Sequence, residues 1–310
     1  MTPSISVRPY RSTDLEPVLD LLRASLGESD VNRRRPEWFS WKHLENPFGR
    51  SIMLVAEDTI GLAGFRAFMR WELTSVDGAR IRCVRPVDTA THPRAQRRGI
   101  FRTLSVEAVE AARGEGIDLI FNTPNPRSKV GYLSMGWSEV GRIGVLMRPK
   151  ATAVTGRAGI PSVPGSEPWK DDPVPDRGPL GLRTPRTPPY LQWRFRHPFA
   201  GYLVARTEQG VAVLRPNRRG RRRELVVSDL FGTQAGRALR QAARAADADY
   251  LVGWFGKRTP ERRQARSAGM LPVPGLTSLT LIARPLRQDL SWAISALARW
   301  DLAFSDLELL

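Results

Sequence analysis

The sequence holds one cysteine, Cys83, few lysines and no long apolar run. A single cysteine excludes an intrachain disulfide framework and suits a reducing compartment. No stretch approaches the ~20 apolar residues that a membrane-spanning helix needs, and residues 1–8 lack the apolar core of a signal peptide. We therefore expect a cytoplasmic protein without a membrane span.

Basic residues strongly outnumber acidic ones, and the formal net charge is +17. Nucleic acid, acidic polymers and anionic lipid are the partners that such a charge attracts. An arginine-, alanine-, glycine- and proline-rich composition with few lysines is also typical of a GC-rich genome. Because no aromatic–basic recognition motif is present, we favour general surface charge. A basic binder of nucleic acid or another anionic polymer stays as an alternative.

A proline-rich segment divides the chain. Ten of the 25 prolines lie within residues 149–189. Such a segment runs neither as a helix nor as a central strand. A chain of 310 residues suits about two domains. We predict domains at 1–148 and 189–310, joined by a linker over 149–188.

An aromatic segment occurs twice, once in each predicted domain. Trp41 and Trp193 hold matching places in the two copies, Lys42 matches Arg194, and a Pro-Phe pair follows in each copy. Both copies lead into a predicted pair of strands, and the order of the later elements also agrees. The pattern predicts an internal duplication of one fold.

Apolar periodicity and turn residues predict an α+β order in both halves. In the first half the predicted strands are 5–10, 52–56, 60–68, 71–76, 80–91 and 117–121, with helices at 15–26, after Gly99 and after Asn125. In the second half the predicted strands are a pair within 201–214, then 224–230, 250–255 and 276–283, with helices at 233–246 and 260–267.

The loop between the strand that ends before Pro93 and the helix after Gly99 is short, polar and basic. The free N–H groups of such a loop and the positive end of the following helix dipole face one point. Four arginines surround it: Arg94, Arg97, Arg98 and Arg102. The arrangement predicts an anion-binding cradle.

This loop resembles the acyl-CoA signature Q/R-x-x-G-x-G/A of the GNAT superfamily of N-acetyltransferases, through Gln96, Arg98 and Gly99. Phe101 departs from the signature, because Gly or Ala is usual at that position. Its large side chain either narrows the approach to the pyrophosphate or points into the core.

The following segment also resembles the family. Asn125, Tyr132 and Gly136-Trp137 match its Asn…Tyr-x-x-x-Gly-Phe pattern, with Trp in place of Phe. The resemblance covers roughly residues 5–148. It implies a GNAT-like α+β fold, a mixed and mainly antiparallel sheet flanked by helices, and the duplication implies that this fold is present twice. The second copy lacks the signature and is expected to be degenerate.

The resemblance implies an acyl-CoA cosubstrate, acetyl-CoA or another acyl-CoA, and no metal. Tyr132 matches the family's general acid for the leaving thiolate. Asp88, beside the cofactor strand, is our first candidate for the base. A capping or surface role suits His92 better, and a structural role suits His43 and His197. The implied cofactor-binding residues are Thr89, Ala90, Thr91, Gln96, Arg97, Arg98, Gly99, Ile100, Phe101, Arg102, Asn125 and Ser128.

The function implied is N-acyltransfer, most simply of acetyl from acetyl-CoA to an amine acceptor. The acceptor class stays open between a small amine, an amino sugar, a peptide and a protein, and the oligomeric state is open too. A catalytically inactive acyl-CoA-binding or scaffold protein on the same fold is the main alternative, because of Phe101.

Overall fold

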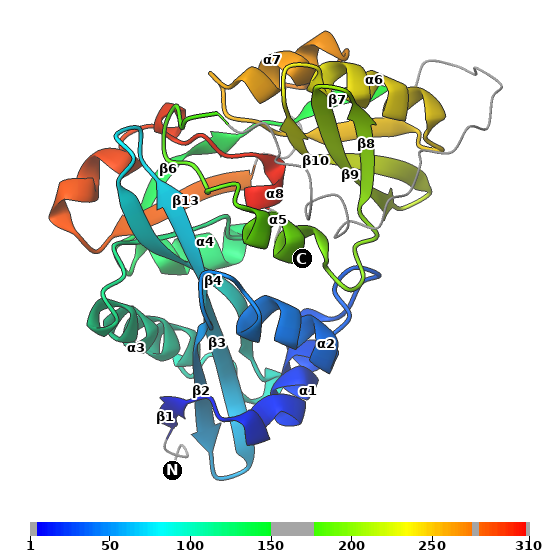
Figure 1. Ribbon diagram of the computed structural model, residues 1–310. Coiled ribbons are helices and arrows are strands. Elements are labelled where there is room, and N and C mark those ends of the chain that lie inside the picture. The colour runs from blue at the N-terminus through cyan, green and yellow to red at the C-terminus, as the bar shows by residue number, and fades with distance from the viewer. Residues whose placement is uncertain (1–4, 150–176, 275–278, 308–310) are drawn as a thin grey trace.

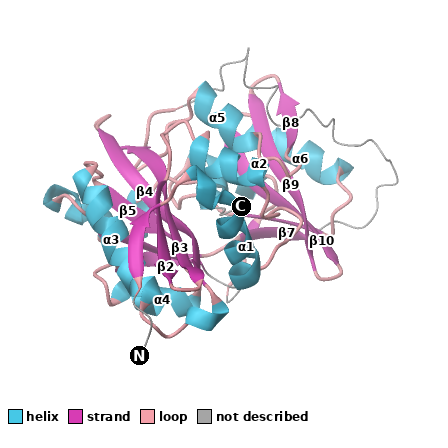
Figure 2. Cartoon of the chain, turned by 90° about the horizontal axis from the view of Figure 1, so that it is seen from below, coloured by secondary structure: helices cyan, strands magenta, loops and turns pink. Residues whose placement is uncertain are grey.

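The computed structural model describes residues 5–149, 177–274 and 279–307. It contains two β-sheets with helices on their faces (Figures 1 and 2), which confirms the predicted α+β fold, present twice. Among the described residues the first sheet has seven strands in the order β1-β2-β3-β4-β5-β13-β6, and the second has six in the order β12-β7-β11-β10-β9-β8.

The first sheet is mostly antiparallel. Its strands are β1 (Ser6–Pro9), β2 (Ile52–Asp58), β3 (Gly61–Thr74), β4 (Arg80–Thr91), β5 (Leu119–Asn122), β6 (Ser138–Ile143) and β13 (Leu279–Pro285). The predicted strands 60–68 and 71–76 are one strand, β3, because Met69 and Arg70 pair with β4 without interruption.

Helices cover both faces of this sheet. One face carries α1 (Leu15–Leu26), α2 (Pro36–Phe39) and the single π-helical turn η2 (Ser40–Leu44), and the other carries α3 (Ile100–Gly114) and α4 (Pro126–Leu133). On α3, Leu104, Ala108 and Ala112 are fully buried against the sheet, as the predicted helical spacing requires.

The second sheet repeats this plan. Its strands are β7 (Leu146–Pro149), β8 (Leu203–Thr207), β9 (Gly210–Arg219), β10 (Arg222–Phe231), β11 (Tyr250–Gly253) and β12 (Leu271–Pro272). Its helices are α5 (Pro188–Phe195), α6 (Ala235–Ala245), α7 (Pro260–Ser267) and the short α8 (Phe304–Leu307). Between β13 and α8 the chain forms two 3-10 helices, Gln288–Ile294 and Leu297–Arg299.

Each half contributes one strand to the sheet of the other half. Strand β7 leaves the first half and pairs with β11 and β12, whereas β13 returns from the second half and lies between β5 and β6 (Figure 1). The boundaries at 148/149 and 189 that we drew from the sequence therefore do not follow the sheets, and the strand predicted at 276–283 belongs to the first sheet. This pairing links residues far apart in the sequence, and local patterns do not reveal it.

Most of the predicted linker, residues 150–176, lies outside the described residues. The remainder packs tightly: Leu182 is fully buried, and Arg183 exchanges two backbone hydrogen bonds with Thr74 at the end of β3. Residues 177–188 therefore add to the contact between the two halves.

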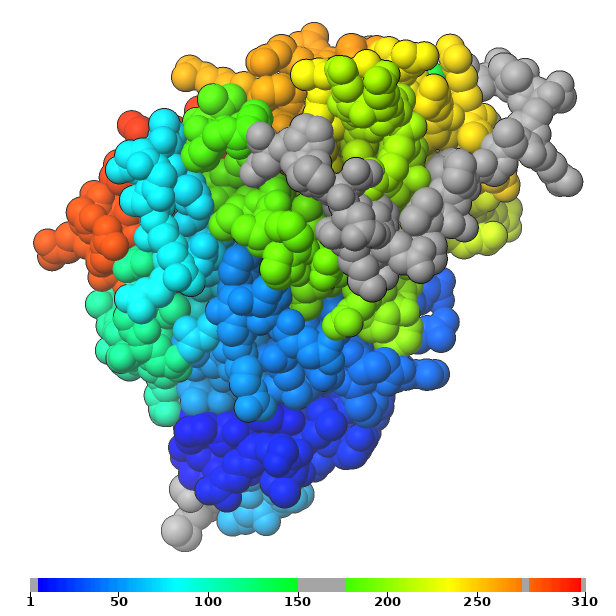
Figure 3. Space-filling view, in the orientation of Figure 1, coloured from blue at the N-terminus to red at the C-terminus, as the bar shows by residue number. Residues whose placement is uncertain are grey.

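The two copies of the aromatic segment meet face to face at the centre of the molecule. The indole rings of Trp41 and Trp193 stack with centroids 5.2 Å apart and an interplanar angle of 14°. Each indole N–H donates to the other residue's backbone carbonyl, at 2.7 and 2.6 Å. Such reciprocity is the mark of a two-fold contact, and it supports the predicted duplication. In Figure 3 the green segment that contains α5 lies directly against the blue N-terminal half.

We predict that Trp41→Ala lowers the free energy of unfolding by about 3–5 kcal/mol, because it removes a buried aromatic ring at the centre of both halves. Trp41→Phe keeps a ring and loses one hydrogen bond, so its loss should be nearer about 1 kcal/mol. Urea denaturation measures both. Ile60→Ala, at a position that is 74% exposed, is the control and should change little. Equal, small losses in all three variants would contradict this account.

Candidate active site

A cavity of about 270 Å³ opens where β4 and β5 separate. The two strands pair only at Cys83–Leu119 and Val84–Ile120, after which β4 continues to Thr91 and β5 ends at Asn122. Six of the residues predicted from the sequence line this cavity: Asp88, Thr89, Phe101, Asn125, Ser128 and Tyr132. Its volume equals that of roughly nine water molecules in the liquid, which is room for one end of a coenzyme.

β4 is irregular beside the cavity. Its pairing with β3 shifts register between Val87 and Ala90, and Asp88 takes a positive φ of 46°. Positive φ is uncommon for a residue other than glycine, although Asp and Asn tolerate it best. The bulge lies beyond the last β4–β5 pair, where Asp88 and Thr89 line the cavity.

Asp88 is buried and surrounded by basic groups. Its carboxylate lies 2.8 Å from Lys42 Nζ, 3.2 Å from Arg34 Nη1 and 3.3 Å from His43 Nε2. Burial alone would raise the pKa of Asp88, but the charge of Lys42, the contact with His43 and the charge of Arg34 hold it far below its usual range. A carboxylate held in this way is a weak base, so the geometry disfavours the role that we predicted for Asp88.

The pKa values of two basic partners of Asp88 are lowered as well, because both groups are buried. Burial lowers the pKa of Lys42 to about 8, although Asp88 opposes the change. Burial likewise lowers the pKa of His43, against the effect of Asp88, and His43 Nδ1 lies 3.0 Å from Ser51 Oγ. His43 thus joins two buried groups, as the structural role predicted for it requires.

Arg66 is a buried cation behind the cavity. Its guanidinium carbon lies 5.1–5.3 Å from the ring centres of Phe68, Phe101 and Tyr132, and Nη1 donates to Thr89 Oγ1. Within the described part of the chain, Nε and Nη2 have no hydrogen-bond partner. Burial lowers the pKa of Arg66, against the influence of Tyr132. A positive charge is therefore fixed beside Tyr132.

The predicted anion cradle lies at the N-terminus of α3. Arg97 and Gly99 both have positive φ, 64° and 76°, and Gly99 has open space where a Cβ would stand. Asp58, the last residue of β2, binds Arg94 at 2.6 Å and Arg98 at 2.9 Å and so holds the loop in place. The free N–H groups at the start of α3 face outward. These features fit an anionic group such as a pyrophosphate.

The other predicted cofactor residues have varied positions. Gln96 and Arg102 are exposed, whereas Ile100 and Ala90 are buried, Ile100 against the sheet beside Gly64. Thr91 lies at the end of β4, where its carbonyl accepts a hydrogen bond from Ser25. The side chains of Ile100 and Ala90 therefore belong to the core, and only their backbone can serve a ligand.

Phe101 fills the contact between α3 and α4. Its ring is packed so closely on Gly131 that a Cβ at that position would stand 2.7 Å from it. The ring also meets the Tyr132 ring edge-on, with centroids 5.5 Å apart. Phe101 thus packs against α4 and also lines the cavity.

Asn125 and Tyr132 lie at the two ends of α4, Asn125 as its exposed N-cap and Tyr132 in its last turn. Asn125 caps the helix, because its Oδ1 accepts the backbone N–H of Ser128 at 2.9 Å. Tyr132 is 3% exposed and packs between Phe101 and Trp137. Sequence reasoning missed Arg34, Lys42 and Arg66. A signal existed for Arg66, which interrupts the apolar strand Ala63–Phe68 on a face that is otherwise buried.

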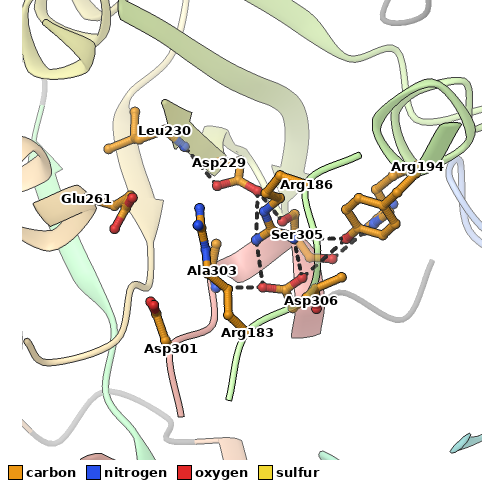
Figure 4. A network of polar contacts seen from close by, with 12 residues as sticks. Arg183, Arg186, Arg194, Asp229, Leu230, Glu261, Asp301, Ala303, Ser305 and Asp306 are labelled. Atoms are coloured by element: carbon orange, nitrogen blue, oxygen red, sulfur yellow. Dashed lines mark hydrogen bonds and ion pairs between the residues drawn. The ribbon is translucent and has the colours of Figure 1, made fainter. Parts of the chain in front are cut away.

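In the second half the corresponding gap is filled by the chain itself. Beyond β11, Gly256 donates to the carbonyl of Leu302, and Ser305 donates to Asp229 on β10 at 2.7 Å. Arg186 binds both Asp306, at 2.7 Å, and Asp229, at 3.1 Å (Figure 4). The segment around α8 thus occupies the place where the first half has its cavity, in agreement with the loss of the cofactor signature there.

Fold and site together define a chain built from two α+β units, of which the first keeps an open strand gap and an anion cradle. Residues 6–140 match the family described as acetyltransferase (GNAT) domain. The first of the two units is therefore similar to GNAT acetyltransferase domains, a family that uses acetyl-CoA as cosubstrate. Among curated proteins, no match was found.

Solved structures share the fold across both halves. Eis1 from Mycobacterium abscessus is 16% identical, with a TM-score of 0.58 over 94% of this chain and 76% of that one. GCN5-related N-acetyltransferases from Kribbella flavida and Anabaena variabilis are 13% and 12% identical, both with TM-scores of 0.61 over 92% of this chain and 72% and 73% of theirs. At these identities the likeness concerns the fold.

Two further observations bear on the sequence predictions. No helix in residues 5–149, 177–274 and 279–307 is long and apolar enough to cross a membrane. The same ranges contain no group of three or more His, Cys, Asp or Glu side chains placed to hold a metal ion.

We predict that Asp88→Asn lowers the free energy of unfolding by about 3–5 kcal/mol near neutral pH, because it leaves Lys42 and Arg34 buried without a counter-charge. Asn tolerates the positive φ at this position, so the change tests charge and not backbone strain. Urea denaturation at about pH 7 and about pH 9.5 measures it. The exposed Asp77→Asn is the control.

The loss in free energy of unfolding that Asp88→Asn causes, called its deficit here, should be smaller at the higher pH. Asp88 raises the folded pKa of Lys42, which is about 8 in the wild type, so the variant's folded pKa lies lower. Between these two folded pKa values the folded variant binds fewer protons than the folded wild type, so its free energy of unfolding rises more steeply with pH and the deficit becomes smaller, up to about pH 8. A deficit that is the same at both pH values, or equal to that of Asp77→Asn, would contradict the charge cluster.

Proposed function

We propose that this chain is an acyl-CoA-dependent N-acyltransferase that moves an acetyl group from acetyl-CoA to an amine acceptor, and that only its first half carries out the reaction. One observation carries the proposal. Beyond Val84, β4 has no pairing with β5, and this open edge runs from the cavity beside Asp88 and Thr89 to the cradle at Gly99. An extended ligand that pairs with an open strand edge is held by backbone hydrogen bonds.

The residues suited to hold the coenzyme lie along this edge. Thr89, Ala90 and Thr91 lie in the part of β4 that does not pair with β5, and the cradle from Gln96 to Arg102 suits the pyrophosphate. When bound, acetyl-CoA supplies an acyl group that is already activated as a thioester. The protein then has to fix the acyl carbon close to the amine, polarise its carbonyl and move protons.

Tyr132 is the proposed proton donor. It lines the cavity, its ring is clamped between Phe101 and Trp137, and Arg66 fixes a positive charge beside it. A nearby cation in a site without water stabilises negative charge that develops on a departing sulfur or on the phenol oxygen. Asp88, in contrast, is proposed to hold Lys42 and Arg34 in place, because a carboxylate with such a low pKa accepts protons poorly.

The second half is proposed to complete the structure of the first. Its own strand gap is filled by the segment around α8, its strand β13 completes the first sheet, and Arg85 on β4 donates to the carbonyl of Leu307. These contacts make the two halves one folding unit. They also leave one site per chain for the coenzyme.

One observation favours the alternative of an inactive member of the family. The packing of Phe101 on Gly131 closes the space between α3 and α4 at the point where the signature usually has Gly or Ala. If this contact is rigid, the coenzyme cannot run from the cradle to the cavity, and the chain is a scaffold.

Titration calorimetry with acetyl-CoA tests the proposal. We expect wild-type protein to bind and Gly99→Glu to lose binding by about a hundredfold or more, because a carboxylate would stand in the anion cradle. Gly78→Glu is the matched control: Gly78 also has a positive φ, 83°, and open space at the Cβ position, but lies in the β3–β4 turn away from the site. It should carry the same backbone strain and bind normally.

The chemical step needs a second comparison. Tyr132→Phe should keep acetyl-CoA binding within about twofold and lower kcat by about 10²-fold, the usual contribution of a general acid. If the wild type fails to bind acetyl-CoA and longer acyl-CoAs alike, the scaffold alternative holds. If Gly78→Glu loses binding as Gly99→Glu does, the cradle is not the binding site.

A further inference from the structure

The cavity has a second side, which the acyl-CoA residues do not explain. Its wall there comes from the end of α1, the following loop and η2, through Leu26, Asn32, Arg34 and Lys42. An amine can approach the bulge of β4 from this side, while the edge of β4 is left to the coenzyme. The charges on this wall therefore influence which acceptors can bind.

The charged groups on this wall do not cancel. Among the described residues that line the cavity, Arg34 and Lys42 are cationic and Asp88 is anionic, which leaves an excess of one positive charge. Arg34 is 6% exposed and Lys42 3% exposed, so water screens them poorly. His43, whose pKa is lowered by burial, is neutral at neutral pH, and Arg85, buried behind Lys42, adds to the positive field.

Arg34 is held in place by its neighbours, and among the described residues its guanidinium keeps one buried donor without a hydrogen bond. Its guanidinium carbon stacks 4.4 Å from the Trp38 ring, its backbone N–H donates to Glu28, and its carbonyl accepts from Arg23. Within the described part of the chain, Nη1 binds Asp88, whereas the buried Nε has no hydrogen-bond partner. The Oδ1 atom of Asn32, on the same wall, is buried and also without a partner.

A fixed guanidinium on a cavity wall that keeps an unpaired donor is suited to a carboxylate, because a guanidinium can bind a carboxylate through two parallel hydrogen bonds. A carboxylate would also neutralise the excess charge, whose burial is otherwise unfavourable. A polycationic acceptor would meet like charges on Arg34 and Lys42 and would be disfavoured by them.

We propose that the acceptor is a small primary amine that carries a carboxylate close to its amino group, as an amino acid does, and that Arg34 binds this carboxylate. The inference rests on the proposed function and specifies its acceptor. The positive wall also favours the uncharged form of the amine, which is the nucleophile. This explains how the site works although Asp88 is a weak base.

The reaction balances without a further reactant. The amine nitrogen forms a bond to the acyl carbon as the carbon–sulfur bond breaks. Tyr132 gives its proton to the departing sulfur, and the proton lost from the amine goes to solvent, from which Tyr132 is reprotonated. The products are the N-acetyl amino acid and free CoA.

Matched acceptor pairs test the proposal: tyrosine with tyramine, phenylalanine with phenethylamine, and lysine with cadaverine, each with acetyl-CoA and with release of free CoA as the readout. Spermidine serves as a polycation. We expect kcat/KM to be at least about tenfold higher for the carboxylate member of at least one pair, the factor that corresponds to one charge-assisted hydrogen bond.

Variants of Arg34 locate the effect. Arg34→Gln should lower kcat/KM for the carboxylate acceptor by about tenfold or more, mainly through KM, and leave its decarboxylated partner within about twofold. Arg34→Lys keeps the positive charge but lacks the planar pair of N–H donors. Its kcat/KM for the carboxylate acceptor should therefore lie between those of the wild type and Arg34→Gln. Arg35→Gln removes an exposed arginine one residue away and should change kcat/KM for neither acceptor. Thermal unfolding of each variant is the control that distinguishes a lower kcat/KM from a loss of folded protein.

The outcomes separate the inference from the function on which it rests. Equal or faster transfer to the decarboxylated amines or to spermidine overturns the carboxylate acceptor and leaves the acyltransferase standing. An equal loss for both members of a pair in Arg34→Gln also overturns it. Failure to bind acetyl-CoA, or binding without transfer to any of these amines, overturns both the acyltransferase with a small amine acceptor and this inference.

Discussion

The reciprocal contact between Trp41 and Trp193 is the interaction on which the arrangement of the molecule depends. Two stacked indoles, each bonded to the other's backbone, fix the two copies of one fold about a local two-fold axis. The exchange of β7 and β13 follows the same symmetry, because each strand is inserted at the corresponding place of the other sheet. Without the exchange, β5 and β6 in one sheet and β11 and β12 in the other would lack the strand that pairs with both of them, and unpaired strand edges are a liability.

The same duplication explains why the two strand gaps differ. Both β4 and β10 carry a register shift near their carboxyl ends, between Val87 and Ala90 in one and between Val227 and Asp229 in the other. In the second half the segment around α8 closes the gap with an ion-pair network, and in the first half the gap stays open as a cavity. One fold thus serves once as a scaffold and once as a site.

Local patterns in the sequence predicted the local parts of the site. The loop before α3, the cap at Asn125 and the position of Tyr132 on α4 follow from spacings within one segment, and the structure has them where they were expected. The charge cluster could not be predicted in this way, because Arg34, Lys42 and Asp88 come from three segments that only the fold brings together. The origin of β13 was missed for the same reason: its partners β5 and β6 lie more than a hundred residues earlier in the chain.

The central claim is that each chain has one coenzyme site, in its first half. Native mass spectrometry of the full chain with an excess of acetyl-CoA tests it most directly, because it counts bound ligands. The account predicts one acetyl-CoA per chain, and none in the Gly99→Glu variant. Two bound molecules per chain, or one that persists in Gly99→Glu, would contradict the claim that the second half has closed its gap and that the cradle at α3 is the binding site.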